Sequence, residues 1–145
     1  VDIFIAQLNK VADGFDDALA ELKAKSKETT LSTTQMKTFL GECGVAETVA
    51  IHYRSVALQS QFIQCRDALS KEQDPHKMKE MVAKLNHILK AEIILAKRLA
   101  ILQGGDSRLG FEASNHYFYV CNDLAEKVIN CRYLLDFWVP QRLKG

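Results

Sequence analysis

The chain has 145 residues, a length that suits one domain with a hydrophobic core of its own. Its 19 Lys and Arg residues nearly balance 18 Asp and Glu residues, and the charges are interspersed instead of forming basic blocks. This composition argues against a nucleic acid or an anionic membrane as a partner. No apolar run reaches the roughly 20 residues that span a bilayer. We therefore expect a single domain over residues 1–145, with no nucleic acid and no membrane as partner.

The first predicted element is a helix over residues 1–25. Its apolar residues recur at helical spacing, from Val1 and Phe4 through Leu8 to Leu22. This pattern starts at the first residue, and neither an initiator Met nor a signal peptide precedes it. We therefore expect a processed product or a piece of a longer chain. The polar stretch KSKETTLSTT follows, and its Ser and Thr residues can cap the next helix.

The second and third helices have clear signals at their ends. The second is predicted over residues 34–70, although two glycines near its start could make it irregular. The third begins after Asp74, which can act as its cap, with Pro75 in the first turn. It runs to about residue 103, where a pair of glycines stops it.

The fourth helix follows an unusually long connection, and Pro140 marks its end. Its apolar residues recur at helical spacing: Leu124, Val128, Cys131, Leu135 and Trp138. No stretch alternates as a strand would, and there is no internal repeat. The pattern predicts an all-α fold, an antiparallel four-helix bundle with a long structured connection between helices three and four.

Polar residues lie where the helices should be apolar. On a wheel of the second helix, one polar column falls within the apolar arc: His52, Ser55, Gln59 and Arg66. On the third helix, Glu92 lies among the core positions. An unpaired ionised carboxylate in a core costs several kcal/mol or more. We therefore expect Glu92 to be buried and paired with a basic or polar group of the second helix, with Arg66 and His52 as the leading candidates.

These five residues form either a buried structural network or the lining of a small-ligand pocket. A di-metal carboxylate centre would need Glu residues from two helices and paired Glu-x-x-His motifs, and the sequence has none. His76 and His87 carry no ligand spacing, and the four cysteines show no CxxC spacing. We predict free structural thiols, no metal site and no cofactor.

The connection GGDSRLGFEASNHYFYVCN is too aromatic to be disordered, and long connections in compact domains are often functional. One interpretation is a structured lid that closes an end of the bundle, with Asp106 and Arg108 paired with each other. The other is a contact surface, because aromatic rings beside planar hydrogen-bonding groups suit a sugar or a protein. The predicted binding residues are Asp106, Arg108, Glu112, Asn115, His116, Tyr117 and Tyr119.

Four stretches, AIHYRSVALQSQFIQCRDAL, LKAEIILAKRLAIL, DSRLGFEASNHYFY and DLAEKVINCRYLL, carry a family resemblance. With them, the chain resembles the C-terminal helical region of large glycan-degrading enzymes of the glycoside hydrolase type from gut Bacteroidetes. The resemblance covers about residues 44–136, and DSRLGFEAS is its most specific motif. In that pattern a Thr or Ser followed by Pro opens the last helix. This chain has Val120, Cys121 and Asn122 there, of which Asn122 can still act as a cap.

The resemblance implies an accessory domain that supports or completes a site formed with an upstream catalytic domain of the same chain. That domain and a carbohydrate are the implied partners, and the implied location is periplasmic or secreted. The catalytic residues stay unknown, because nothing places Glu92 and Glu112 at a separation that glycoside hydrolysis requires. The alternative is an independent four-helix module that binds a ligand or a protein. An autonomous enzyme would need a nucleophile-and-base motif, a phosphate loop or a metal constellation, and the sequence shows none.

Overall fold

The computed structural model describes residues 1–145 except 107, 110, 113–115, 118–119 and 144–145. Four long helices account for most of the described chain: α1 (Asp2–Ser26), α2 (Thr33–Leu69), α3 (Pro75–Gly105) and α4 (Cys121–Tyr133). The predicted all-helical fold with four helices is confirmed, and the helices begin and end close to the predicted positions.

Local hydrogen bonds explain where α2 and α3 begin. The hydroxyl of Ser32 accepts a hydrogen bond from the backbone N–H of Gln35 at 3.3 Å, and the Gln35 side chain accepts one from the Ser32 N–H at 3.0 Å. This reciprocal arrangement is a capping box. Asp74 caps α3 as predicted, because its carboxylate accepts from the His76 N–H at 2.8 Å. α2 runs through its two glycines without a break, so the expected irregularity is not found.

The last helical segment is less regular than predicted. α4 follows Val120 without a side-chain cap, so Asn122 lies inside the helix and does not cap it. α4 continues into a π-helix, η1 (Leu134–Trp138), and a final turn, α5 (Val139–Gln141). Pro140 has no N–H, and its ring would meet the carbonyl four residues earlier in a continuous α-helix. The wider π turn just before it relieves that conflict.

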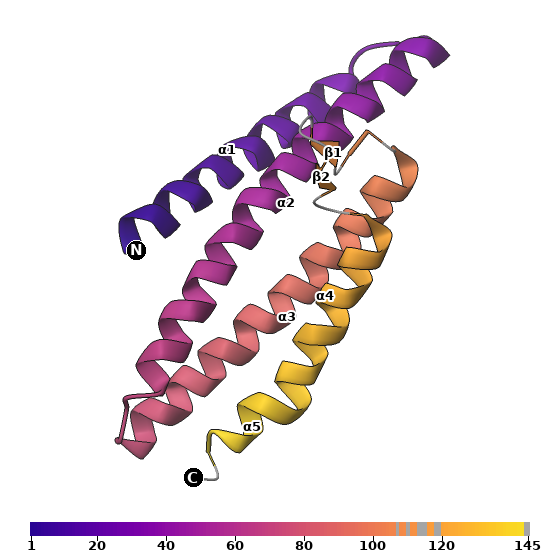
Figure 1. Ribbon diagram of the computed structural model, residues 1–145. Helices are drawn as coiled ribbons and strands as arrows, with labels where there is room; N and C mark the ends of the chain where they lie inside the picture. The colour runs from indigo at the N-terminus through magenta and orange to yellow at the C-terminus, as the bar shows by residue number, and fades with distance from the viewer. Residues whose placement is uncertain (107, 110, 113–115, 118–119, 144–145) are drawn as a thin grey trace.

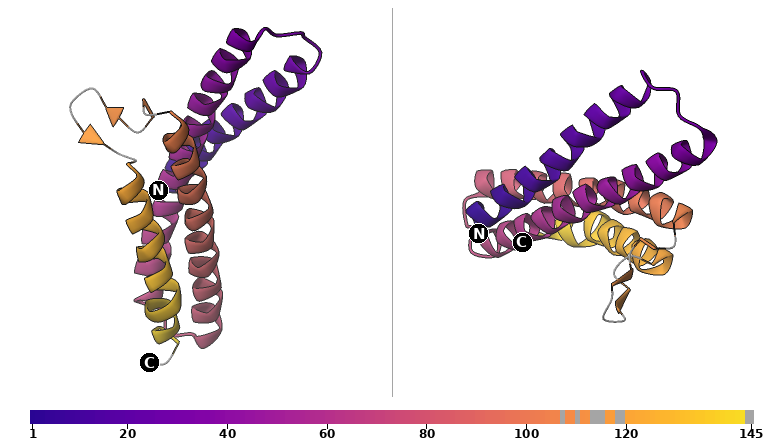
Figure 2. Two further views of the ribbon diagram at one scale, coloured as in Figure 1. Left: turned by 90° about the vertical axis from the view of Figure 1, so that its right-hand side faces the viewer. Right: turned by 90° about the horizontal axis from the view of Figure 1, so that it is seen from above.

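The four helices form an open arrangement. α1 and α2 make a hairpin, and the backbone of α1 contacts α2 and no other helix of the described residues. α3 lies between α2 and α4. In the left view of Figure 2, the ends of α1 and α2 nearest their connection extend beyond α3 and α4. α1 is therefore an outer layer on α2, and the core lies between α2, α3 and α4.

Two buried clusters make up that core. The larger one comprises Cys65, Leu69, Val82, Leu85, Leu89, Ile93, Cys131 and Val139, and the smaller one comprises Ile51, Ala96, Leu99 and Leu124. α1 contributes only one buried line, at a spacing of seven residues: Ile5, Ala12 and Leu19. The buried α2 residues at the same spacing are small, Cys43, Ala50 and Ala57. Small side chains let two helices approach closely, which explains how α1 packs on α2 without a third helix.

The connection between α3 and α4 contains a short antiparallel ladder. β1 (Phe111–Glu112) pairs with β2 (His116–Tyr117), with Phe111 opposite Tyr117 and Glu112 opposite His116. No strand was expected here, because two residues are too few to show alternation. Within the described residues, the backbone of the ladder contacts no helix. Both views of Figure 2 show the ladder standing away from the helices.

Candidate functional site

Glu92 lies at the centre of a buried polar cluster. It is 4% exposed, which confirms the predicted burial. Its Oε2 atom is 2.7 Å from Nζ of Lys127 on α4, and it accepts a hydrogen bond from Oγ of Ser55 on α2 at 3.1 Å. Lys127 Nζ also donates to Ser55 Oγ at 2.7 Å. An ammonium, a carboxylate and a hydroxyl from three helices therefore meet in the core, and we call this group, with Gln59, the Glu92 cluster.

The cation beside Glu92 is not the predicted one. Arg66 pairs with its neighbour Asp67 at 2.8 Å and is largely exposed. A helical wheel gives the direction of a side chain around the helix but not its distance along the helix. At 1.5 Å per residue, Arg66 lies roughly 16 Å along α2 from Ser55, too far to share its contacts. Lys127 was missed, although it comes three residues after the core residue Leu124 and so shares its face.

The hydrogen bonds of the Glu92 cluster favour a structural role. Ser55 donates to Glu92, and it accepts from Lys127 and from Nε2 of Gln59 at 3.1 Å. Its hydroxyl thus uses its one donor and both acceptor positions. Ser55 is 5% exposed, and the carboxylate that accepts its proton is held in an ion pair by Lys127, so a substrate meets neither an accessible hydroxyl nor a free base. Of the two predicted interpretations, this geometry favours the buried network.

His52 lies at the edge of the cluster. Its pKa is lowered, first because half-burial disfavours the charged imidazolium and second because the Lys127 ammonium repels a further positive charge. Its ring stands nearly perpendicular to that of Tyr53, with 5.7 Å between the ring centroids. The predicted polar column therefore divides: His52, Ser55 and Gln59 gather near Lys127, while Arg66 turns to Asp67.

A groove of about 280 Å³ opens beside the Glu92 cluster. Its walls are mostly apolar and come from α2, α3 and α4, and its polar lining residues are Gln59, Arg66, Glu92 and Lys127. The Oε1 atom of Glu92 is buried and has no hydrogen-bond partner among the described residues. The groove is just below the usual range for ligand sites, roughly 300 to 1,000 Å³. Its apolar walls and few polar groups are nevertheless the combination that a small ligand would use.

The start of the connection brings Asp106 and Arg108 together. Arg108 Nη2 lies 2.6 Å from Asp106 Oδ2, and Arg108 Nε donates to Oδ1 at 2.9 Å. The backbone N–H of Arg108 donates to Oδ1 as well, at 3.0 Å. The guanidinium and this N–H lower the pKa of Asp106 to about 2. The predicted pairing of these two side chains is confirmed.

The other predicted binding residues are described only in part. The ladder places the backbone of Glu112 opposite that of His116, and the backbone of Tyr117 opposite Phe111. The side chains of Glu112, His116 and Tyr117 lie outside the described part of the structure. Asn115 and Tyr119 lie outside the described residues altogether.

A shallow groove of about 480 Å³ lies where the connection leaves α3. We call it the connection groove. It is lined by Lys37, Leu40, Gly41 and Gly44 of α2, by Ile101, Leu102 and Gly105 of α3, and by Asp106, Arg108 and Leu109. Leu40 and Ile101 are 60% and 66% exposed, respectively. An exposed aliphatic wall beside a charged pair resembles the core and rim of a protein interface.

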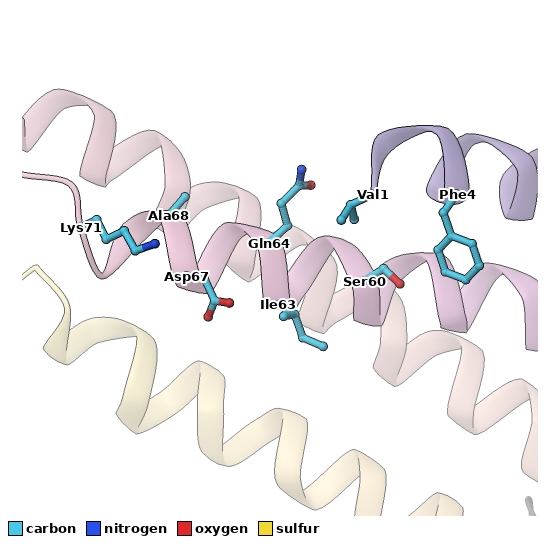
Figure 3. Close-up of a pocket in the computed structure, with 8 residues that line it drawn as sticks. All are labelled: Val1, Phe4, Ser60, Ile63, Gln64, Asp67, Ala68 and Lys71. Atoms are coloured by element: carbon cyan, nitrogen blue, oxygen red, sulfur yellow. The ribbon is translucent and has the colours of Figure 1, made fainter.

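A third hollow, of about 780 Å³, lies between the start of α1 and the second half of α2. Figure 3 shows Val1 and Phe4 of α1 beside the side of α2 that carries Ser60, Ile63 and Gln64. Phe4 and Ile63 are each about half exposed. The signal for this surface was present in the sequence, because the apolar arc of α1 is wider than the single line that α2 covers.

Comparisons with known proteins identify no relative of this chain: no family model, no curated protein and no solved structure matches it. Among the described residues, no three His, Cys, Asp or Glu side chains are grouped as a metal ion would require. No helix of the described residues is long and apolar enough to cross a membrane.

Proposed function

We propose that this chain is a helical accessory domain of a glycan-degrading enzyme, where it supports or completes a site formed with an upstream catalytic domain. In this proposal the helices act as an antiparallel bundle with α1 at its edge, and the connection groove is the docking surface. The observation that carries the proposal is the position of the Asp106–Arg108 pair beside exposed Leu40 and Ile101. This pair belongs to DSRLGFEAS, the most specific motif of the resemblance.

The connection groove has the chemistry that a docked domain would use. Full burial of an exposed Leu or Ile side chain stabilises a complex by roughly 1.5 to 3 kcal/mol. One edge of the Arg108 guanidinium binds the Asp106 carboxylate, and 71% of the Arg108 side chain is exposed. Its outer edge can therefore bind a carboxylate of the partner, and Arg is among the residues enriched at interfaces.

The ladder supports a contact surface more than a lid. A lid that closes the end of the bundle would lie against the helices, whereas the backbone of β1 and β2 contacts no helix of the described residues. A segment that stands away from a rigid scaffold is suited to recognition, because loops carry contacts while the helices hold them in place. The Glu92 cluster, deep between three helices, then serves the stability of the scaffold.

The test uses the full-length protein and the isolated 145-residue chain together. In the full-length protein, Arg108→Ala combined with His116→Ala should lower glycan hydrolysis by roughly tenfold or more, the loss of about 1.4 kcal/mol of productive docking. The isolated chain with the same changes should melt almost as before. A control variant, Ile94→Asp with Ile129→Asp, places charges on two exposed positions away from the groove and should leave activity unchanged. A large loss of stability in the isolated chain, with activity intact, would show a structural lid and contradict the proposal.

The alternative, an independent module that binds a small ligand, is favoured by the groove beside the Glu92 cluster. A ligand there would rest on apolar walls and bond to Lys127 and Gln59. Thermal shift screening separates the two functions. A compound that raises the melting temperature of the wild-type chain, but not of Gln59→Leu, would support the ligand-binding module.

A further inference from the structure

α1 exposes an apolar stripe beside the line that it buries against α2. Phe4 and Leu22 are five turns apart at 3.6 residues per turn, so their side chains leave the helix in the same direction. Val11 lies within about 20° of that direction at 100° per residue. All three side chains are exposed, although they are large and apolar. The stripe therefore runs along most of α1.

α2 carries a matching stripe. Val45 and Ile63 are also five turns apart and both are exposed, and Val56 lies half-buried between them. Ile63 shares the hollow of Figure 3 with Val1 and Phe4, so the stripes of the two helices open on the same side of the hairpin.

Polar contacts between the helices set how the two stripes align. Arg54 of α2 pairs with Asp13 of α1 at 2.9 Å, and Gln64 donates to Asp2 at 2.8 Å. These two contacts show which residues of α1 and α2 lie at the same level along the hairpin. At this alignment three apolar pairs lie side by side: Phe4 with Ile63, Val11 with Val56, and Leu22 with Val45. The side of the hairpin away from Arg54 is thus apolar at both ends and in the middle. We call it the hairpin face.

We propose that two copies of this chain associate through their hairpin faces, so that two α1–α2 hairpins form an antiparallel four-helix bundle. α1 packs on α2 alone, and a second hairpin would supply the layer that its exposed stripe lacks. The two end pairs, Phe4 with Ile63 and Leu22 with Val45, lie nine residues on either side of the paired Asp13 and Arg54. A two-fold axis at the level of Asp13 and Arg54 therefore sets the Phe4–Ile63 pair of one copy on the Leu22–Val45 pair of the other, apolar on apolar, as a self-complementary interface requires.

The exposed area agrees with the size of a stable dimer. The hairpin face includes five exposed apolar residues: Phe4 53%, Val11 39%, Leu22 50%, Val45 37% and Ile63 50%. Side chains of this size bury up to roughly 150 to 200 Å² each, so their exposed fractions sum to roughly 400 Å² per chain. A standard interface buries roughly 800 Å² per partner, of which about 60% is apolar, or roughly 500 Å². A second copy is thus sufficient to cover the face.

The test is the mass of the 145-residue chain in solution, measured by sedimentation equilibrium and by light scattering at micromolar concentrations. The expected result is twice the 16.3 kDa mass of one chain. Phe4→Glu with Ile63→Glu should raise the dissociation constant by roughly tenfold or more, because the charges would lose water on association. Leu22→Glu with Val45→Glu, at the other end of the face, should do the same. Circular dichroism checks that each variant keeps its helix content.

The matched control places the same charges elsewhere. Ile94→Glu with Ile129→Glu changes two residues of α3 and α4 that are at least as exposed and should leave the dimer intact. A wild-type chain that stays monomeric throughout would overturn the proposal. So would a dimer that folded variants of the hairpin face leave unchanged. The experiment needs no catalytic domain and does not involve the connection groove, so its outcome is independent of the proposed function.

Discussion

Lys127 of α4 lies 2.7 Å from Glu92 of α3, and the two side chains share the hydroxyl of Ser55 on α2. The carboxylate is almost completely buried, and the ammonium keeps 27% of its side chain exposed. A buried ion pair adds little to stability compared with apolar residues of the same shape, but removing one partner leaves the other charge buried and unpaired. The pair therefore makes these three helices depend on one another.

We expect Glu92→Ala to lower the free energy of unfolding by about 3 to 5 kcal/mol, the range for a broken buried pair. Urea denaturation with circular dichroism measures the change. The double variant Glu92→Ala with Lys127→Ala should lose less than the sum of the single losses, because the two groups interact directly. The control is Arg66→Ala, which breaks only an exposed pair with Asp67 and should cost about 1 kcal/mol or less. Equal losses for Glu92→Ala and Arg66→Ala would contradict the observed pairing.

Local chemistry explains which parts of the fold were predictable. Asp74 with Pro75 marked the start of α3, because a capping carboxylate and a residue without an N–H suit only a first turn. The burial of Glu92 followed from its place between apolar residues at helical spacing. The π-helix before Pro140 was not predicted, since the sequence shows the steric conflict but not whether the helix ends or widens there.

Contacts between elements were harder to predict. Arg66 and Lys127 are both cations on core-facing positions, and the choice between them depends on how far each lies along its helix once the helices are packed. The position of α1 depends on the same kind of information. An apolar stripe predicts that a helix packs against something, but it does not say how many neighbours cover it. The strand ladder is too short for a periodic signal.

His52 should make stability depend on pH. Its pKa is below 6.5 in the folded chain because burial and the Lys127 ammonium disfavour its charge. As the pH falls through 6.5, the unfolded chain takes up a proton that the folded chain does not bind, so the free energy of unfolding decreases. The decrease ends once the pH is below the folded pKa. His52→Asn should remove this part of the pH dependence.

The same shift can be measured directly. Titration by NMR should show a His52 imidazole pKa below 6.5, and Lys127→Gln should raise it part of the way back, since burial remains. A His52 pKa at or above 6.5 would show that the imidazole is solvated.

The four free cysteines should differ sharply in reactivity. Cys121 is exposed, whereas Cys43, Cys65 and Cys131 are buried. Burial raises the pKa of the Cys65 and Cys131 thiols, and the Glu92 carboxylate raises that of Cys131 further. An aromatic disulfide reagent should therefore modify one thiol quickly in the folded chain and the other three roughly tenfold or more slowly. Cys121→Ser should abolish the fast phase, and a fast phase of two or more thiols would contradict the packing of α2 or α4.

The Asp106–Arg108 pair leads to a prediction in the isolated chain. The pKa of Asp106 is about 2 because Arg108 donates to its carboxylate from both the guanidinium and the backbone N–H. Arg108→Ala should raise it toward 3.8, though not completely, since the N–H at position 108 remains. Arg108→Lys should give an intermediate value, because an ammonium keeps the charge but not the paired bonds. Carboxyl chemical shifts measured between pH 1.5 and pH 6, about two units on either side of the ordinary Asp pKa, report all three values.

The dependence of stability on pH and on Arg108 distinguishes this surface pair from an ion pair that the fold requires. A depressed pKa contributes stability above 3.8, and that contribution is lost as the pH falls toward 2. Because the pair is at the surface, Arg108→Ala should leave the melting temperature at pH 7 nearly unchanged. Asp106 would then be an ionised acceptor that holds Arg108 in place, with the exposed edge of the guanidinium directed at a partner. A titration of Asp106 near 3.8 in the wild-type chain would show that the pair does not persist in solution, and the connection groove would lose its oriented arginine.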